Sequence, residues 1–79
     1  MKRGTYGPVE GVCVRWSDDD GWGAIASPAV DGEIFAMFAD IDGDGYKRLR
    51  IGQAVTLTYE TPGFLQDGYP HRAISVQTR

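Results

Sequence analysis

The stretch DDDGWGAIA, residues 18–26, contains the two patterns that decide the fold. It begins with three acids and a glycine, a composition typical of a turn. After the glycine, the side chains alternate with a period of two, which is typical of a β-strand. In this alternation Ile25 lies on one face and Trp22 on the other. The stretch therefore predicts a turn followed by a strand with one aliphatic face and one face that carries an aromatic ring.

The same alternation predicts four further strands, at residues 12–16, 34–38, 55–59 and 74–76. The 11 glycines and 4 prolines interrupt the 79-residue chain too often for long helices. A chain of this length has room for a small core, so residues 1–79 are expected to form a single domain. Five short strands must hide their edges, and the sequence therefore predicts an all-β fold, a closed or nearly closed five-stranded antiparallel barrel.

One face of each predicted strand is expected to point into the barrel. The core expected from this alternation consists of Val14, Ile25, Ile34, Val55, Leu57, Ile74 and Val76. Trp22, Phe35 and Met37 would then point outward on neighbouring strands. An outward aromatic patch on a small barrel is a stacking platform for unpaired bases, each of which offers a π-face. The alternative is that these rings only cover the barrel surface.

Composition excludes several other classes of protein. The net charge of −3 argues against a protein that holds duplex DNA mainly through its phosphates. A single cysteine cannot form an internal disulfide, and zinc would need at least three more ligands. No apolar run approaches the ~18 residues that span a membrane, and none follows the basic N-terminus as in a signal peptide. We therefore expect a soluble, cytoplasmic protein with no membrane partner.

A calcium loop is the first alternative that the motifs raise. Asp40, Asp42, Asp44 and Gly45 fit the opening of such a loop, but its twelfth position is Ile51 rather than Glu. Flanking helices are also missing from the pattern. A turn rich in Asp and Gly is the better interpretation, and no metal site is predicted.

An enzyme is the second alternative. His71 is the only histidine and has no evident nucleophilic partner, since Cys13 lies within a strand. The adjacent carboxylates of residues 18–20 could imitate a hydrolytic pair, but neighbouring acids in a turn are usually only solvated. The sequence predicts no catalytic site, no cofactor and no small-molecule substrate.

Three segments, taken in order, resemble the bacterial cold-shock proteins: GVCVRWSDDDGWGAI (11–25), EIFAMF (33–38) and ADIDGDGYKRLRIGQAVTLTY (39–59). DGWGAI (20–25) falls on the family's first ribonucleoprotein motif, and IFAMF (34–38) falls on the second. The similarity covers about residues 10–76. It implies a barrel of the oligonucleotide-binding (OB) type that binds single-stranded DNA and RNA.

The chain is a divergent member by this resemblance. The turn between Trp16 and Gly21 is one residue shorter than the family pattern. Residues that the family uses as aromatic or basic groups are replaced at Ser17, Asp20, Ala24 and Met37. By simple alternation Trp16 would share a face with Val12 and Val14, whereas the resemblance puts its ring on the platform. That placement requires a β-bulge or a strong twist.

These observations together predict a monomeric protein that binds single-stranded DNA or RNA with little sequence selectivity. By resemblance, its role would be that of an RNA chaperone or a regulator of transcription or translation. The side chains expected to bind are Arg15, Trp16, Trp22, Phe35, Met37, Phe38, Tyr46, Lys47, His71 and Arg72. The acids at 18–20 would repel phosphate near Trp22, weakening binding or narrowing where a strand can pass. The alternative is a barrel that has lost nucleic-acid affinity and binds a protein partner.

Overall fold

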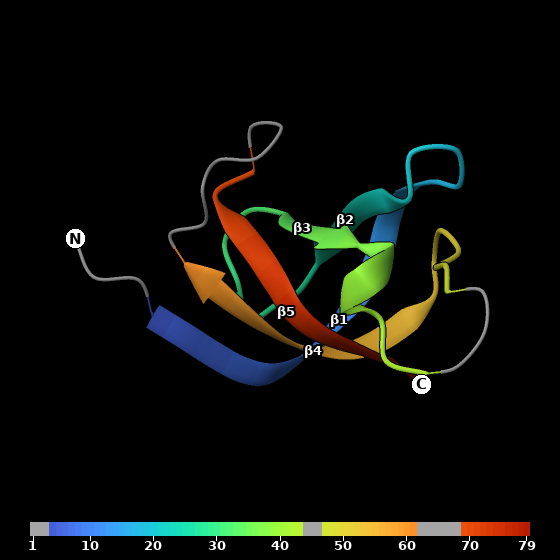
Figure 1. The fold of residues 1–79 in the computed structure, drawn as a ribbon. Helices are drawn as coiled ribbons and strands as arrows, with labels where there is room; N and C mark the ends of the chain where they lie inside the picture. The colour runs from blue at the N-terminus through green and yellow to red at the C-terminus, as the bar shows by residue number, and fades with distance from the viewer. Residues whose placement is uncertain (1–3, 44–46, 62–68) are drawn as a thin grey trace.

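The computed structural model describes residues 4–43, 47–61 and 69–79. Within these ranges lie the strands β1 (Gly4–Ser17), β2 (Trp22–Ala26), β3 (Ile34–Met37), β4 (Ala54–Thr61) and β5 (His71–Thr78), and the single-turn helix η1 (Phe38–Asp40). The strands form a closed barrel in the order β1-β2-β3-β5-β4 (Figure 1), which confirms the predicted five-stranded all-β barrel. No helix in the described ranges is long and apolar enough to cross a membrane.

One pairing in the barrel differs from the antiparallel prediction. β3 and β5 run parallel, with Ile34 opposite His71 and Phe35 opposite Arg72, whereas the other four pairings are antiparallel. The physical reason is geometric. Strand direction cannot alternate all the way round a closed ring with an odd number of strands, so one neighbouring pair must be parallel.

β1 joins the two ends of the strand order, because it pairs with both β2 and β4. Its first part pairs with β4 and its last part with β2, and Val12 has a Cα partner in each, Ala54 and Ala26. The register with β2 shifts between Cys13 and Arg15. This is the irregularity that the placement of Trp16 requires.

The shift changes which side chains reach the interior. Cys13 is fully buried, whereas Val14 is only half-buried, so the prediction of Val14 as a core residue is wrong. The Cys13 thiol donates to the carbonyl of Arg15 at the shift (3.2 Å). Burial raises the pKa of this thiol, which is therefore neutral and unreactive near pH 7.

A second register shift changes which side chains of β5 are buried. The β4–β5 register moves between Thr58 and Tyr59, whose partners are Ser75 and Ala73, and Ile74 between them has no partner. Ile74 is 43% exposed, so its prediction as a core residue is wrong, while Ala73 and Val76 are buried. The remaining predicted core residues are confirmed, because all have exposed fractions of 1% or less: Ile25, Ile34, Val55, Leu57 and Val76.

The connection between β3 and β4 also contributes to the core. Ile41 and Leu49 are buried in the same cluster as the strand residues, and Ile41 forms a parallel bridge with Val76 of β5. This connection is therefore anchored at two points against the barrel, and its residues Gly52 and Gln53 hydrogen-bond to Cys13 of β1.

Candidate nucleic-acid interface

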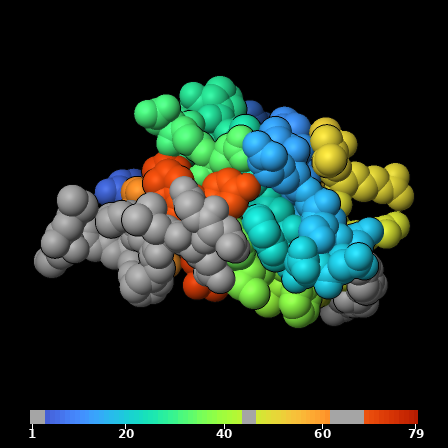
Figure 2. Space-filling model, turned by 90° about the horizontal axis from the view of Figure 1, so that it is seen from above, coloured from blue at the N-terminus to red at the C-terminus, as the bar shows by residue number. Residues whose placement is uncertain are grey.

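Three aromatic rings form a cluster on the outer face of β2 and β3. Trp22 stacks on Phe35 with ring centroids 5.1 Å apart and an interplanar angle of 30°. The ring of Tyr69 lies edge-on to Trp22 at 6.1 Å and tilted to Phe35 at 6.0 Å. Figure 2 shows the chain from residue 69 onward (orange-red) beside β2 (teal). Phe35 is buried but does not belong to the hydrophobic cluster that fills the barrel, whereas its strand neighbours Ile34 and Ala36 do, so its ring lies on the opposite face of β3 from theirs.

Phe35 is nevertheless not an open stacking surface. It is only 2% exposed, whereas Trp22 is half-buried. The expectation that Phe35 itself presents a ring to a ligand is therefore wrong, because Trp22 and Tyr69 cover it. Its contribution is to support Trp22 from behind, and Met37 lies beside Trp22 as its Cα partner on β3.

A second aromatic group lies where the turn at residues 18–20 meets η1. Trp16 and Phe38 line a surface hollow of about 330 Å³ together with this turn, Gly21 and Lys47. Phe38 is 52% exposed, and its amide donates to the carbonyl of Gly21 (2.8 Å). Gly21 has a φ of +73°, and a Cβ there would lie 3.0 Å from Cδ1 of Phe38. Glycine at this position lets the Phe38 ring pack closely against the turn.

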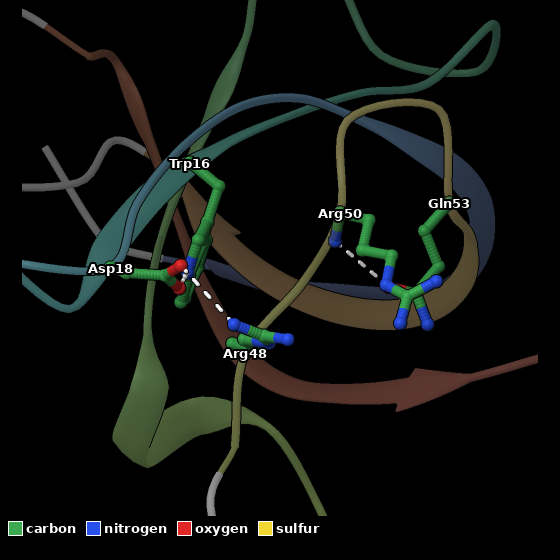
Figure 3. Close-up of polar contacts among 5 residues, drawn as sticks. All are labelled: Trp16, Asp18, Arg48, Arg50 and Gln53. Atoms are coloured by element: carbon green, nitrogen blue, oxygen red, sulfur yellow. Dashed lines mark hydrogen bonds and ion pairs between the residues drawn. The ribbon is translucent and has the colours of Figure 1, made fainter.

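Asp18 holds the ring of Trp16 in place. The indole Nε1–H of Trp16 donates to Oδ1 of Asp18 (3.0 Å), and Nη1 of Arg48 donates to Oδ2 of the same carboxylate (3.3 Å). Figure 3 shows these three side chains converging. Trp16 is opposite Gly23 of β2 and half-buried against the core. Gly23 is required there, because a Cβ would lie 2.0 Å from the carbonyl oxygen of Arg15.

Asp20 has a different task, which is to close the turn. Its amide donates to Oγ of Ser17 (3.2 Å), and the Ser17 hydroxyl donates back to Oδ2 of Asp20 (3.1 Å). The amide of Gly21 donates to the carbonyl of Ser17 (2.8 Å). Two of the three acids are therefore committed to local structure, while Asp19 has no hydrogen bond to another described residue.

The predicted cationic residues differ in the contacts that they make. Arg15 pairs with Glu33 (3.1 Å) on the surface, and this hydrogen bond raises the pKa of Arg15. The guanidinium of Arg72 lies 3.8 Å from the sulfur of Met37, at the edge of the ring cluster. Lys47 lines the hollow beside Phe38.

His71 does not join this interface. Its Nδ1 lies 2.8 Å from Oγ1 of Thr61, and its Nε2 lies 2.6 Å from the carbonyl oxygen of Asp31. Its ring meets Tyr59 edge-on at 5.7 Å. Both ring nitrogens are thus occupied within the protein, and His71 ties β5 to the end of β4 and to the turn before β3. Tyr46, the remaining predicted platform ring, lies outside the described residues.

Two of the acids that imitate a calcium loop, Asp40 and Asp42, have structural partners, and Asp44 lies outside the described residues. Asp40 accepts a hydrogen bond from the amide of Met37 (3.0 Å), and burial raises its pKa despite this bond and the nearby Arg72. Asp42 accepts a hydrogen bond from the Ser75 hydroxyl (2.9 Å). In the described part of the chain, no cluster of three or more His, Cys, Asp or Glu side chains is arranged to hold a metal ion.

Sequence reasoning missed Tyr69, Arg48 and Arg50. Tyr69 lies in a turn-rich segment without alternation, so only the closing of β5 against β3 brings it to Trp22. The arginines follow the Asp-rich turn in sequence, and the anchoring of this connection to β1 places Arg48 beside Asp18 and Arg50 in a hollow shared with Ile51.

Two curated proteins are similar to this chain. The cold shock-like protein CspD of Vibrio cholerae is 40% identical over 55 residues, which cover 70% of this chain and 72% of that protein. The cold shock-like protein CspD of Haemophilus influenzae is 42% identical over 43 residues, 53% of this chain and 60% of that protein. No protein-family model matches the chain. The OB-type barrel, the aromatic cluster on β2 and β3 and these two relatives agree, and the chain belongs to the cold-shock protein family, whose members bind nucleic acids.

Proposed function

We propose that this protein binds single-stranded DNA or RNA by stacking unpaired bases on Trp22, Trp16 and Phe38, with little sequence selectivity. The observation that carries the proposal is the Trp22 ring, which is half-buried, backed by Phe35 at 5.1 Å and flanked by Tyr69. A ring fixed in this way loses little conformational freedom when a base stacks on it. Stacking is also tolerant of sequence, because every base has a π-face.

The affinity is expected to be micromolar or weaker. Each stacked base is worth ~1–3 kcal/mol by alanine substitution, and a micromolar complex needs about 8 kcal/mol in total. Two positions that carry rings in the family are Ser17 and Ala24 here, and Ala24 is completely buried. Few rings are present, and the acidic turn beside them repels phosphate. Stacking of a few bases therefore supplies most of the binding free energy.

Weak, unselective binding suits the role of an RNA chaperone or a regulator of transcription or translation. A protein that keeps RNA single-stranded must also release it, and stacking without base-edge hydrogen bonds allows this. Duplex DNA is a poor ligand for such a surface, since its bases are already stacked on one another.

The test is a fluorescence titration with oligothymidine of about eight nucleotides, within the range bound by one OB fold. Trp22→Ala and Phe38→Ala are each expected to weaken binding by about tenfold or more, which is ~1–3 kcal/mol per lost stack. Tyr6→Ala is the matched control, because Tyr6 and Phe38 are both 52% exposed but Tyr6 lies on β1 beside β4. Equal effects of Phe38→Ala and Tyr6→Ala would contradict the proposal, and no binding by the parent protein would favour a protein partner.

A further inference from the structure

The two sides of Trp16 differ in charge. On one side is the hollow of about 330 Å³ already described, lined by the three carboxylates of residues 18–20 and the single cation Lys47. On the other side Trp16 lines a second hollow, also of about 330 Å³, whose charged residue is Arg15. Val14, Trp22 and Ile51 supply further apolar lining of this second hollow. A single strand bound at Trp22 can therefore continue past Trp16 on an acidic side or on a basic side.

The basic side continues beyond Ile51. This side chain, 72% exposed, also lines a third hollow of about 550 Å³, together with Arg48, Arg50 and Gln53. Ile51 is thus shared by two neighbouring hollows, one lined by Trp22 and Trp16 and the other by Arg50. In Figure 2 the loop of residues 47–53 (yellow) projects beside the end of β1 (blue).

The loop that carries Arg50 is held by hydrogen bonds. The amide of Gly52 donates to the carbonyl of Cys13 (2.7 Å), and the amide of Cys13 donates to the carbonyl of Gln53 (2.9 Å). Within the loop, the amide of Arg50 donates to the side-chain oxygen of Gln53 (2.9 Å; Figure 3). The backbone at Arg50 is therefore held against β1, and only the side chain of Arg50 has to be ordered when a ligand binds.

Arg50 is also the cation of this surface that pairs with no acid in the described part of the chain. Arg15 pairs with Glu33 and Arg48 with Asp18, whereas Arg50 has no ion pair with any residue of the described ranges. The pair between Arg15 and Glu33 is exposed on both sides, and such pairs are weak enough for a phosphate to compete with them.

We propose that the sugar–phosphate backbone of the bound single strand runs over the surface of Arg15, Ile51 and Arg50, and not across the acidic turn at residues 18–20. Bases would stack on Trp22 and Trp16, and the phosphates between and beyond them would meet the guanidinium groups of Arg15 and Arg50. Guanidinium groups suit this role, because their planar donors bind phosphate in a bidentate manner. This inference rests on the proposed function and adds the direction in which the strand leaves the platform.

The test combines charge removal and charge addition on the two sides of Trp16. Arg50→Gln is expected to weaken oligothymidine binding by about tenfold at ~20 mM salt and to reduce the salt slope by about 0.7, the value for one phosphate contact on a single strand. Ile51→Lys is expected to tighten binding and steepen the slope, and Ile51→Glu to weaken it. Both positions are exposed, so the variants should unfold at the parent temperature.

Arg79→Gln removes the same charge from the C-terminal strand end, where Arg79 pairs with Glu10, and serves as the control. Its salt slope should equal that of the parent. Lys47→Gln and Asp20→Lys examine the acidic side. If they change the slope more than Arg50→Gln and Ile51→Lys do, the backbone crosses the turn and the inferred direction is wrong. Loss of binding in Trp22→Ala together with an unchanged slope in Arg50→Gln would also overturn the direction, while leaving the proposed function intact.

Discussion

At the scale of single residues, the acids beside the platform are mainly structural. Asp18 fixes the indole of Trp16 and pairs with Arg48, and Asp20 closes the turn through Ser17. They also concentrate negative charge on one side of the tryptophan rings. Asp40 is a third case, since it is half-buried and fixes the start of η1 by accepting from the amide of Met37.

Asp40 gives a prediction about pH. Burial raises its pKa, so the folded protein binds this proton more tightly than the unfolded chain does. The contribution of Asp40 to the free energy of unfolding should therefore fall as the pH rises from about 4, the ordinary pKa, through the raised pKa of the folded state. Asp40→Asn keeps an oxygen that accepts from Met37 but has no charge to desolvate. We expect this variant to be at least as stable as the parent at about pH 7, measured by urea unfolding.

The control is Asp19→Asn, because Asp19 is exposed and has no hydrogen bond within the described residues. Its stability should follow that of the parent at every pH. A parent that gains stability relative to Asp40→Asn as the pH rises above 4 would show that the charged form of Asp40 is favoured in the fold, against this account.

At the scale of elements, the sequence predicted where strands lie better than which side chains they bury. Period-two alternation located all five strands, but it missed the first part of β1, where Gly4, Gly7 and Pro8 interrupt the pattern. It also assumed unbroken alternation, which the register shifts at Val14 and Ile74 reverse. Such shifts depend on pairing with partner strands, and a strand's own sequence does not encode them.

The two isoleucines at positions 34 and 74 provide a matched test of this point. Both lie in strands, yet Ile34 is completely buried and Ile74 is 43% exposed at the shift in β5. Ile34→Ala should lower the free energy of unfolding by about 2–5 kcal/mol, the usual cost for a buried aliphatic side chain. Ile74→Ala should cost well under half as much. Comparable losses in chemical denaturation would mean that Ile74 points into the barrel.

At the scale of the whole molecule, the barrel brings together groups that no local pattern connects. The parallel pairing of β3 and β5 follows from closing five strands, and it carries Tyr69 to Trp22 and Arg72 to Met37. The sequence alone could single out Trp22 and Trp16 as candidate site residues, through alternation and through resemblance. It could not show that Phe35 is covered, that both ring nitrogens of His71 have partners, or that the acids of residues 18–20 line one surface hollow while Arg15 and Arg50 line two others.

The central claim, that bases stack on Trp22, is tested most directly in a chain with one tryptophan. In a Trp16→Phe variant, Trp22 is the only source of indole fluorescence. We expect oligothymidine to quench this emission in a saturable manner, with a shallow salt dependence, and a duplex of the same length to leave it unchanged. If saturating oligothymidine does not change the emission of Trp22, bases do not stack on this ring.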